Sequence, residues 1–255
     1  MRFSKWHALG NSYAVVERGD AGTLTPDRAR RLCDAEEGLD TDGILEIVWT
    51  DGSHAEVVIW NPDGSTAEMS GNGTRIAARW LADRAGTEQV SIGVGGRTVL
   101  ARMLDEANVE TELGEVDVGA PETLELDGSP TELTPVSVGN PHAVVRRRRL
   151  QRDDLLVLGP QLERHPRFHE RTNVQLVVPT GEHDIEALIW ERGAGETSAS
   201  GSSAVAVAAA ALARGWCTSP VDVHMPGGTL RVTIADGSAS LVGPAEKLGE
   251  GVIVL

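Results

Sequence analysis

Cysteine and lysine are scarce in this chain, and each scarcity excludes a class of protein. The 255 residues contain two cysteines, Cys33 and Cys217, and neither belongs to a Cys-x-x-Cys or Cys/His ligand pattern. This argues against a structural zinc site and a disulfide framework, and it fits a reducing cytoplasm. The only lysines, Lys5 and Lys247, lie in no motif typical of a Schiff-base lysine, so pyridoxal phosphate chemistry is not indicated. We therefore expect neither a metal nor an organic cofactor.

Long apolar stretches and basic patches are also lacking. The longest run of low polarity, residues 204–213, is too short to span a bilayer, and the first seven residues contain no apolar signal core. The formal net charge is −15, and the one basic run is the four arginines at 146–149. We expect a cytoplasmic protein that binds neither nucleic acid nor a membrane. The sequence leaves the oligomeric state open between a monomer and a homodimer.

What the chain does contain is an internal repeat. Three short patterns recur in the same order at an offset of about 130 residues: Gly10-Asn11 as Gly139-Asn140, Ser70-Gly71-Asn72 as Ser200-Gly201-Ser202, and Gly95-Gly96 as Gly227-Gly228. Such constant spacing indicates a duplicated half. We predict an N-terminal half of residues 1–115, completed by a C-terminal strand at 246–255, and a C-terminal half of residues 116–245.

The two halves share one series of elements. Residues 44–49 and 55–60 alternate apolar and polar side chains, which predicts strands, and further strands are expected within 91–103 and 221–234. Helices are predicted at 71–83 and 201–214, the second buried on all sides because it is small and apolar all round. A surface helix is expected at 26–33, after Thr25 as N-cap. The prediction is a mixed α/β fold of two pseudo-symmetric halves. Each half is a barrel-like sheet around a central helix, with the active site in the cleft between them.

Ser70 and Ser200 occupy matching positions just before the two central helices. A serine before a helix is usually an N-cap alone. Here both segments are rich in glycine and repeated, so the backbone N–H groups of two helix starts can approach one ligand and hold a carboxylate. We therefore predict a paired anion site at these two serines.

Polar residues near these helix starts can recognise the remainder of an amino acid. Glu191 suits an ammonium group and Arg192 a carboxylate. Four asparagines and a histidine lie where strands break into turns, although turns favour asparagine for backbone reasons alone: Asn11, Asn61, Asn140, Asn173 and His142. The predicted partner is a small zwitterionic amino acid.

These motifs resemble those of the diaminopimelate epimerase family. The resemblance extends over essentially the whole chain in five segments: Lys5-Trp-His-Ala-Leu-Gly-Asn11, Asn61-Pro-Asp-Gly-Ser-Thr-Ala-Glu-Met-Ser70-Gly-Asn-Gly-Thr-Arg75, Gly139-Asn-Pro-His142, Glu191-Arg-Gly-Ala-Gly-Glu-Thr-Ser-Ala-Ser200-Gly-Ser, and Met225-Pro-Gly-Gly228. It implies the family's two-domain fold and its cofactor-independent isomerisation of LL- to meso-diaminopimelate in lysine and cell-wall precursor synthesis.

The resemblance also implies roles for particular residues. Six residues would recognise the substrate, most of them by holding its distal amino-acid head: Asn11, Asn61, Asn140, Asn173, Glu191 and Arg192. The backbone N–H groups of four residues would bind the carboxylate at the reacting carbon: Gly71, Asn72, Gly201 and Ser202. Each catalytic position of the family is a cysteine, one on each face of the reacting carbon.

Both catalytic positions are serine in this chain, at Ser70 and Ser200. A thiol near a helix N-terminus is readily ionised, whereas a serine hydroxyl needs an adjacent base before it can remove a proton. Three explanations fit: a deliberate replacement of both cysteines, a natural subfamily whose serines are helped by a neighbour such as His142 or Glu68, and a non-catalytic amino-acid binder. A lyase or another isomerase of the same fold is a further alternative.

Overall fold

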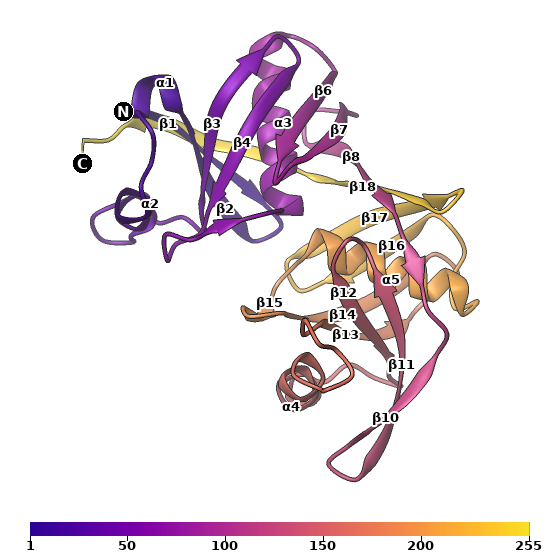
Figure 1. Ribbon diagram of the computed structural model, residues 1–255. Coiled ribbons are helices and arrows are strands. Elements are labelled where there is room, and N and C mark those ends of the chain that lie inside the picture. Colours follow the sequence, from indigo (N-terminus) through magenta and orange to yellow (C-terminus); the bar gives the residue numbers. More distant parts are fainter. Residues whose placement is uncertain (255) are drawn as a thin grey trace. The chain divides into compact units, whose positions relative to one another are not determined.

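The chain forms two compact units in a computed structural model, which describes residues 1–254. Unit 1 contains Met1–Glu112 and the segment from Val242 onward, and unit 2 contains Leu113–Leu241. The chain enters unit 2 within β8 (Asn108–Glu115) and returns within β18 (Ser238–Pro244). Strands predominate over helices in both units (Figure 1). The mixed α/β class expected from the sequence is therefore confirmed.

The sheet of unit 1 alternates antiparallel and parallel neighbours. Its strands in spatial order are β19 (Glu246–Val252), β1 (Arg2–Ala8), β2 (Asn11–Glu17), β3 (Ile44–Asp51), β4 (His54–Trp60), β6 (Gln89–Val94), β7 (Arg97–Met103) and β8. The pairs β2–β3 and β4–β6 are parallel, and the other neighbours are antiparallel. A parallel pair requires a crossover connection, and each of these two connections contains at least one helix.

Unit 2 repeats this order of pairings. Its strands are β11 (Ser129–Ser137), β12 (Pro141–Arg146), β13 (Asn173–Pro179), β14 (Asp184–Glu191), β16 (Val221–Met225) and β17 (Gly228–Ala235). The parallel pairs are β12–β13 and β14–β16, which correspond to β2–β3 and β4–β6. Four short strands flank these sheets: β5 (Thr66–Ala67) on β4, β15 (Gly195–Thr197) on β14, and β9 (Asp117–Val118) and β10 (Glu122–Leu126) on β11.

One central helix fills each unit. The helix α3 (Gly71–Ala85) contacts β1, β2, β4, β6 and β7, and α5 (Gly201–Ala213) contacts seven strands from β9 to β17. A helix can touch so many strands only if the sheet curls around it. Residues 203–211 of α5 are all buried, as expected for a helix that is apolar on every face.

The remaining helices cover the outside of each unit. The helix α2 (Pro26–Cys33) has the predicted bounds, with Thr25 Oγ1 accepting from the Arg28 N–H at 3.4 Å. A short helix, α1 (Arg18–Ala21), precedes it. The corresponding helix of unit 2, α4 (Arg152–Glu163), was not predicted because it contains Pro160, which disfavours a helix interior.

The regions expected to be strands at 91–103 and 221–234 are each a hairpin. Their turns are Gly95-Gly96 and Pro226-Gly227, and both turns support the segment that leads to a central helix. A Cβ atom added to Gly95 would lie 2.1 Å from the Glu68 carbonyl oxygen, and the Gly227 N–H donates to the Ser198 carbonyl at 2.8 Å. Glu68 and Ser198 each lie two residues before the N-cap serine. The repeated glycines therefore have a packing role next to the candidate site.

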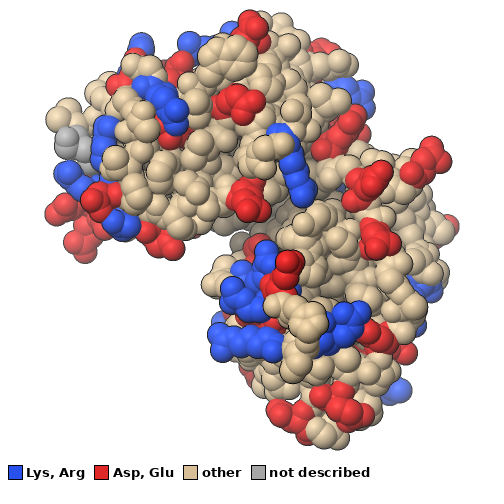
Figure 2. Space-filling view, in the orientation of Figure 1, with Lys and Arg blue, Asp and Glu red and all other residues tan. Residues whose placement is uncertain are grey.

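Charged side chains of both signs are interspersed over the face shown in Figure 2. Among residues 1–254, no helix is long and apolar enough to cross a membrane.

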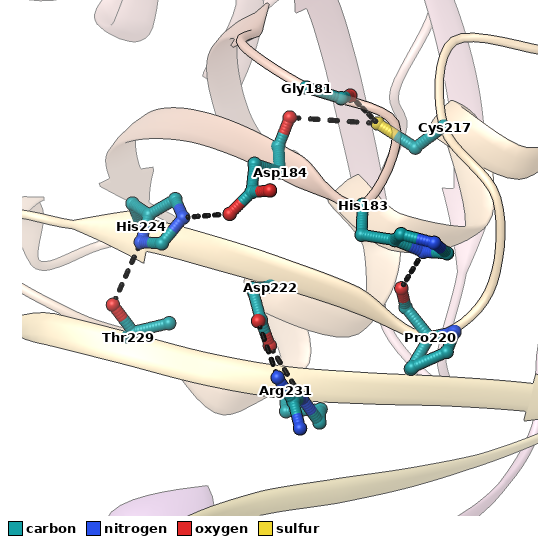
Figure 3. A network of polar contacts seen from close by, with 9 residues as sticks. All are labelled: Gly181, His183, Asp184, Cys217, Pro220, Asp222, His224, Thr229 and Arg231. Atoms are coloured by element: carbon teal, nitrogen blue, oxygen red, sulfur yellow. Dashed lines mark hydrogen bonds and ion pairs between the residues drawn. The ribbon is translucent and has the colours of Figure 1, made fainter.

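Polar contacts link the neighbouring strands β14, β16 and β17 in unit 2 (Figure 3). His224 Nε2 lies 2.8 Å from Asp184 Oδ1, and Arg231 binds Asp222 through two hydrogen bonds of 2.7 and 2.8 Å. Cys217 Sγ lies 3.8 Å from the Asp184 carbonyl, and burial raises the pKa of this thiol. Cys217 is therefore a structural thiol that is held in its protonated form.

Candidate active site

Ser70 and Ser200 are the N-cap residues of α3 and α5, as predicted. Both have extended backbone conformations, with φ, ψ of −140°, 117° at Ser70 and −147°, 127° at Ser200. The N–H groups of the first helical turn, at Gly71, Asn72 and Gly201 among others, have no carbonyl acceptor within the helix. Each helix start therefore presents N–H donors and the positive end of a helix dipole to an anion.

The Ser70 hydroxyl has two neighbours within its own unit. It accepts a hydrogen bond from the Gly73 N–H at 3.0 Å, which is the usual capping contact. The phenol oxygen of Tyr13, on β2, lies 3.1 Å from Ser70 Oγ. Tyr13 was not predicted as a site residue, although it occupies the position in the first repeat that His142 occupies in the second.

The Ser200 hydroxyl is buried and lies beside a carboxyl group instead. Burial raises the pKa of Glu191, and the hydroxyl groups of Thr197 and Ser200, which lie near its carboxyl group, only partly counteract this. No side-chain capping bond ties Ser200 to its own helix. Ser200 and Glu191 therefore form a hydroxyl–carboxyl pair at the start of α5.

In unit 1, a chain of hydrogen bonds orients the asparagines at the start of α3. The Arg75 guanidinium, which is fully buried, donates to Asn72 Oδ1 at 2.5 Å, and Asn72 Nδ2 donates to Asn11 Oδ1 at 2.6 Å. Burial lowers the pKa of Arg75 to about 10. With its oxygen engaged in this way, Asn11 has its amide N–H donors to offer to a ligand.

In unit 2, a second chain of hydrogen bonds orients Asn140. Gln175 Nε2 lies 3.0 Å from both Ser203 Oγ and His142 Nδ1, and His142 Nε2 lies 2.9 Å from Asn140 Oδ1. An amide nitrogen can only donate, so His142 accepts at Nδ1 and carries its proton at Nε2. Both ring nitrogens are occupied by protein groups, and burial lowers the pKa of His142 to about 3. His142 is thus neutral, and through its bond to Asn140 Oδ1 it orients that amide.

Acid should destabilise the fold through His142. Between its ordinary pKa of about 6.5 and its folded value of about 3, the unfolded chain binds a proton that the folded chain does not. The free energy of unfolding therefore falls as the pH drops below 6.5, by about 2 kcal/mol at pH 5. Urea unfolding at pH 7 and pH 5 should show this loss in the parent chain and a smaller loss in His142→Gln. His169→Gln, at an exposed position, is the control. An equal loss in both variants would contradict the assignment.

Asn173 joins two loops of the candidate site in unit 2. Its Nδ2 donates to the Pro141 carbonyl at 3.0 Å, and its Oδ1 accepts from the Arg192 N–H at 3.0 Å. The Arg192 guanidinium is exposed, and its Nη1 donates to the Glu170 carbonyl. Asn173 therefore holds the turn after Gly139 and the turn after Glu191 in a fixed relation.

Asn61 and Glu191 are equivalent positions, each following a tryptophan at the end of a strand. The Asn61 Nδ2 donates to Ser65 Oγ at 2.9 Å, across a turn that contains Gly64 at φ +81°. Such a positive φ favours glycine, as it does at Gly193 (φ +81°) in the second loop.

A buried glutamate anchors each of these two tryptophans, Trp60 before Asn61 and Trp190 before Glu191. Trp60 Nε1 donates to Glu46 at 2.9 Å, and Trp190 Nε1 donates to Glu163 at 2.8 Å. Burial alone would raise the pKa of Glu163, but hydrogen bonds from Trp190 and from the Gly193 N–H lower it below its usual range. Glu163 lies at the end of α4 and was missed in the sequence, because neither its spacing nor its neighbours resemble a motif.

Other groups are not placed for proton transfer. Glu68 is exposed, and its carbonyl rather than its carboxylate faces the Gly95 turn. Cys217 follows the end of α5 opposite to Ser200, about 20 Å away along a helix of 13 residues. Burial raises the pKa of the Cys33 thiol. Among residues 1–254, no group of three or more His, Cys, Asp or Glu side chains is placed to hold a metal ion.

Solved structures share this fold. A predicted epimerase from Pseudomonas aeruginosa matches with a TM-score of 0.74 at 19% identity, covering 100% of this chain and 99% of that one. A probable proline racemase from Agrobacterium radiobacter matches with a TM-score of 0.73 at 14% identity, covering 100% and 93%. The fold of the chain therefore belongs to the same class as the fold of these two structures.

Sequence comparison narrows this class to one family. The model of the diaminopimelate epimerase family matches residues 3–121 and 134–248. Diaminopimelate epimerases from Pseudomonas fluorescens and Azotobacter vinelandii are 32% and 34% identical to the chain over 274 residues, which cover 100% of the chain and 99% of each relative. The chain belongs to the diaminopimelate epimerase family and is an isomerase.

Proposed function

We propose that this chain interconverts LL- and meso-diaminopimelate by removing the α-proton on one face of the carbon and returning a proton on the other. The observation that carries this proposal is the matched pair of N-cap serines, each of which has a second proton-carrying group beside it. Ser70 has Tyr13 at 3.1 Å, and Ser200 has the carboxyl group of Glu191. Inversion of a tetrahedral carbon requires two such groups, acting on one substrate molecule.

The start of each helix would bind the carboxylate at the reacting carbon. Negative charge grows on this carboxylate as the α-proton leaves, and preorganised N–H donors stabilise developing charge better than water does. The donors that we assign to this role belong to Gly71, Asn72, Gly201 and Ser202. The first turns of α3 and α5 contain these residues.

The distal amino-acid head would be held by the remaining polar residues. Asn11 and Asn140 each have their side-chain oxygen engaged by a protein donor, so each offers N–H groups to a carboxylate. The Arg192 guanidinium can bind a carboxylate, and Glu191 is the anionic group suited to an ammonium. Asn61 and Asn173 complete this set, Asn173 chiefly by fixing the loops.

Serine in place of cysteine should make the reaction slow. One well-placed acid or base contributes on the order of 10²–10⁴ to a rate, and a hydroxyl is a far weaker acid than a thiol. Glu191 can accept the Ser200 proton while Ser200 takes the proton of the substrate, which allows the step to occur without a free alkoxide. We place this activity in the cytoplasm, where the two free cysteines would stay reduced.

Exchange of the α-proton tests the proposal. With diaminopimelate in D₂O at high enzyme concentration, we expect deuterium to appear at the α-position together with conversion between LL and meso forms, as followed by mass spectrometry and chiral chromatography. Saturable calorimetric binding without exchange would instead establish an amino-acid binder. Formation of a keto or imine product from a β-hydroxy amino acid, without exchange into diaminopimelate, would establish a lyase.

A further inference from the structure

We propose that Tyr13 is the proton-relay partner of Ser70, supplying through the Ser70 hydroxyl the proton that one face of the α-carbon receives. This inference rests on the proposed function and extends it to a residue outside the family motifs identified in the sequence. The contact that carries it is the 3.1 Å separation between the Tyr13 and Ser70 oxygen atoms, both in unit 1.

The position of the Tyr13 ring is fixed by tight packing. The side chain is 9% exposed and lies in the core cluster that contains Trp6, Leu45 and Ile59. A Cβ atom added to Gly43 would lie 2.7 Å from the Tyr13 ring and 2.7 Å from the Trp60 carbonyl, so the ring fits only because residue 43 has no side chain. Packing therefore fixes the ring, and its hydroxyl oxygen lies 3.1 Å from Ser70 Oγ.

The hydrogen bonds at Ser70 favour proton donation to a substrate. The Gly73 N–H already donates to Ser70 Oγ. If Tyr13 donates to the same oxygen, both lone pairs are occupied and the Ser70 proton points to a third partner. At the start of α3, that partner is the reacting carbon of the bound amino acid.

The relay moves two protons and leaves no alkoxide. The Ser70 O–H bond breaks as the carbanion forms a C–H bond, and the Tyr13 O–H bond breaks as a new Ser70 O–H bond forms. The negative charge ends on the phenolate oxygen of Tyr13, which regains a proton from water. Phenols ionise near pH 10, so the charge rests on a much weaker base than a serine alkoxide. In the opposite direction the same bonds form and break in reverse.

The two repeats therefore use different partners for equivalent serines. His142, at the position equivalent to Tyr13, is held between Gln175 and Asn140 and is not available for a relay. Ser200 has Glu191 instead, at the position equivalent to Asn61. The carboxyl group of Glu191 is suited to act as a base beside Ser200. The phenol of Tyr13 is suited to act as an acid beside Ser70.

Tyr13→Phe tests the relay, because it removes one oxygen atom and keeps the ring. With Ser70 present, we expect inversion to slow by at least about 10²-fold with little change in KM. Deuterium exchange should persist from the one stereoisomer whose α-proton faces Ser200 and be lost from the other. A general loss of structure would reduce both exchanges alike.

Ser70→Cys provides the matched background. A thiol is acidic enough to donate without a relay, so Tyr13→Phe should change the rate only a few-fold when it is combined with Ser70→Cys. Tyr13 is the only tyrosine in the chain, so biosynthetic incorporation of a fluorotyrosine alters this site alone. The basic limb of the pH–rate profile should then move to lower pH with the acidity of the phenol, in the parent background only.

The possible results separate the two proposals. An equal loss in the parent and the Ser70→Cys backgrounds, or no loss in either, would overturn the relay while leaving epimerisation intact. If neither the parent chain nor Ser70→Cys converts diaminopimelate, then the proposed function itself fails and the relay fails with it. A large loss confined to the parent background, with one-sided exchange, would establish the relay.

Discussion

Replacing both Ser70 and Ser200 with cysteine is expected to raise the rate of α-proton exchange on diaminopimelate by about 10²–10⁴-fold. A free thiol has a pKa of about 8.5, and a helix N-terminus lowers it further, so a thiolate becomes accessible near neutral pH. Both positions are N-caps of helices longer than three turns, α3 with 15 residues and α5 with 13. The measurement is exchange in D₂O at equal enzyme concentration.

Each single replacement should give only part of this gain. Inversion needs an acid on one face and a base on the other, so the remaining serine limits the rate until both are changed. Ser129→Cys with Ser238→Cys is the matched control, because both positions are exposed and lie in strands of unit 2. A double Ser70→Cys, Ser200→Cys variant that is no faster than the parent would show that the scaffold is not a competent epimerase.

Glu191→Gln is expected to reduce inversion by about 10²–10⁴-fold and to weaken substrate binding as well. The substitution keeps the shape of the side chain and removes the negative charge, so it would eliminate both the proposed partner for an ammonium group and the proposed proton acceptor beside Ser200. Glu196→Gln, in the neighbouring strand β15, should stay within a few-fold of the parent because Glu196 pairs with Arg152 at the surface. Initial rates and calorimetric binding distinguish the two losses.

The pH dependence of kcat/KM gives a second measurement for Glu191. Burial raises the pKa of its carboxyl group, so the base form is lost on acidification at a higher pH than for an ordinary glutamate. Activity should fall as the pH decreases through this raised value, and that acid limb should be absent from Glu191→Gln. An acid limb that is identical in both proteins would assign the base to another group.

Local patterns predicted much of the secondary structure and the positions of both helix starts. Alternation at 44–49 and 55–60 indicated β3 and β4, which extend to Asp51 and begin at His54. The α4 helix was missed because Pro160 and Gly159 are unfavourable in isolation. A Cβ at Gly159 would lie 2.6 Å from Trp190, so close packing against that ring explains the glycine.

Hydrogen-bond partners that lie far apart in the chain could not be predicted from the sequence. Gln175 is 33 residues from His142 and 28 from Ser203, and Tyr13 is 57 residues from Ser70. Nothing in a local pattern specifies such contacts, because they depend on strand register and on how the sheet curls around its helix. The internal repeat could have indicated Tyr13 as a site residue, because it aligns Tyr13 with His142.

The sequence by itself determined that two glycine-rich helix starts exist, that each begins with serine, and that their spacing repeats, because caps, glycine positions and apolar periodicity are local properties of the chain. Only the tertiary structure decided which group stands next to each serine. Hydrogen-bond partners are selected by packing between distant segments: the absence of a side chain at Gly43 admits the Tyr13 ring, and the close approach of β14 to α5 places Glu191 beside Ser200.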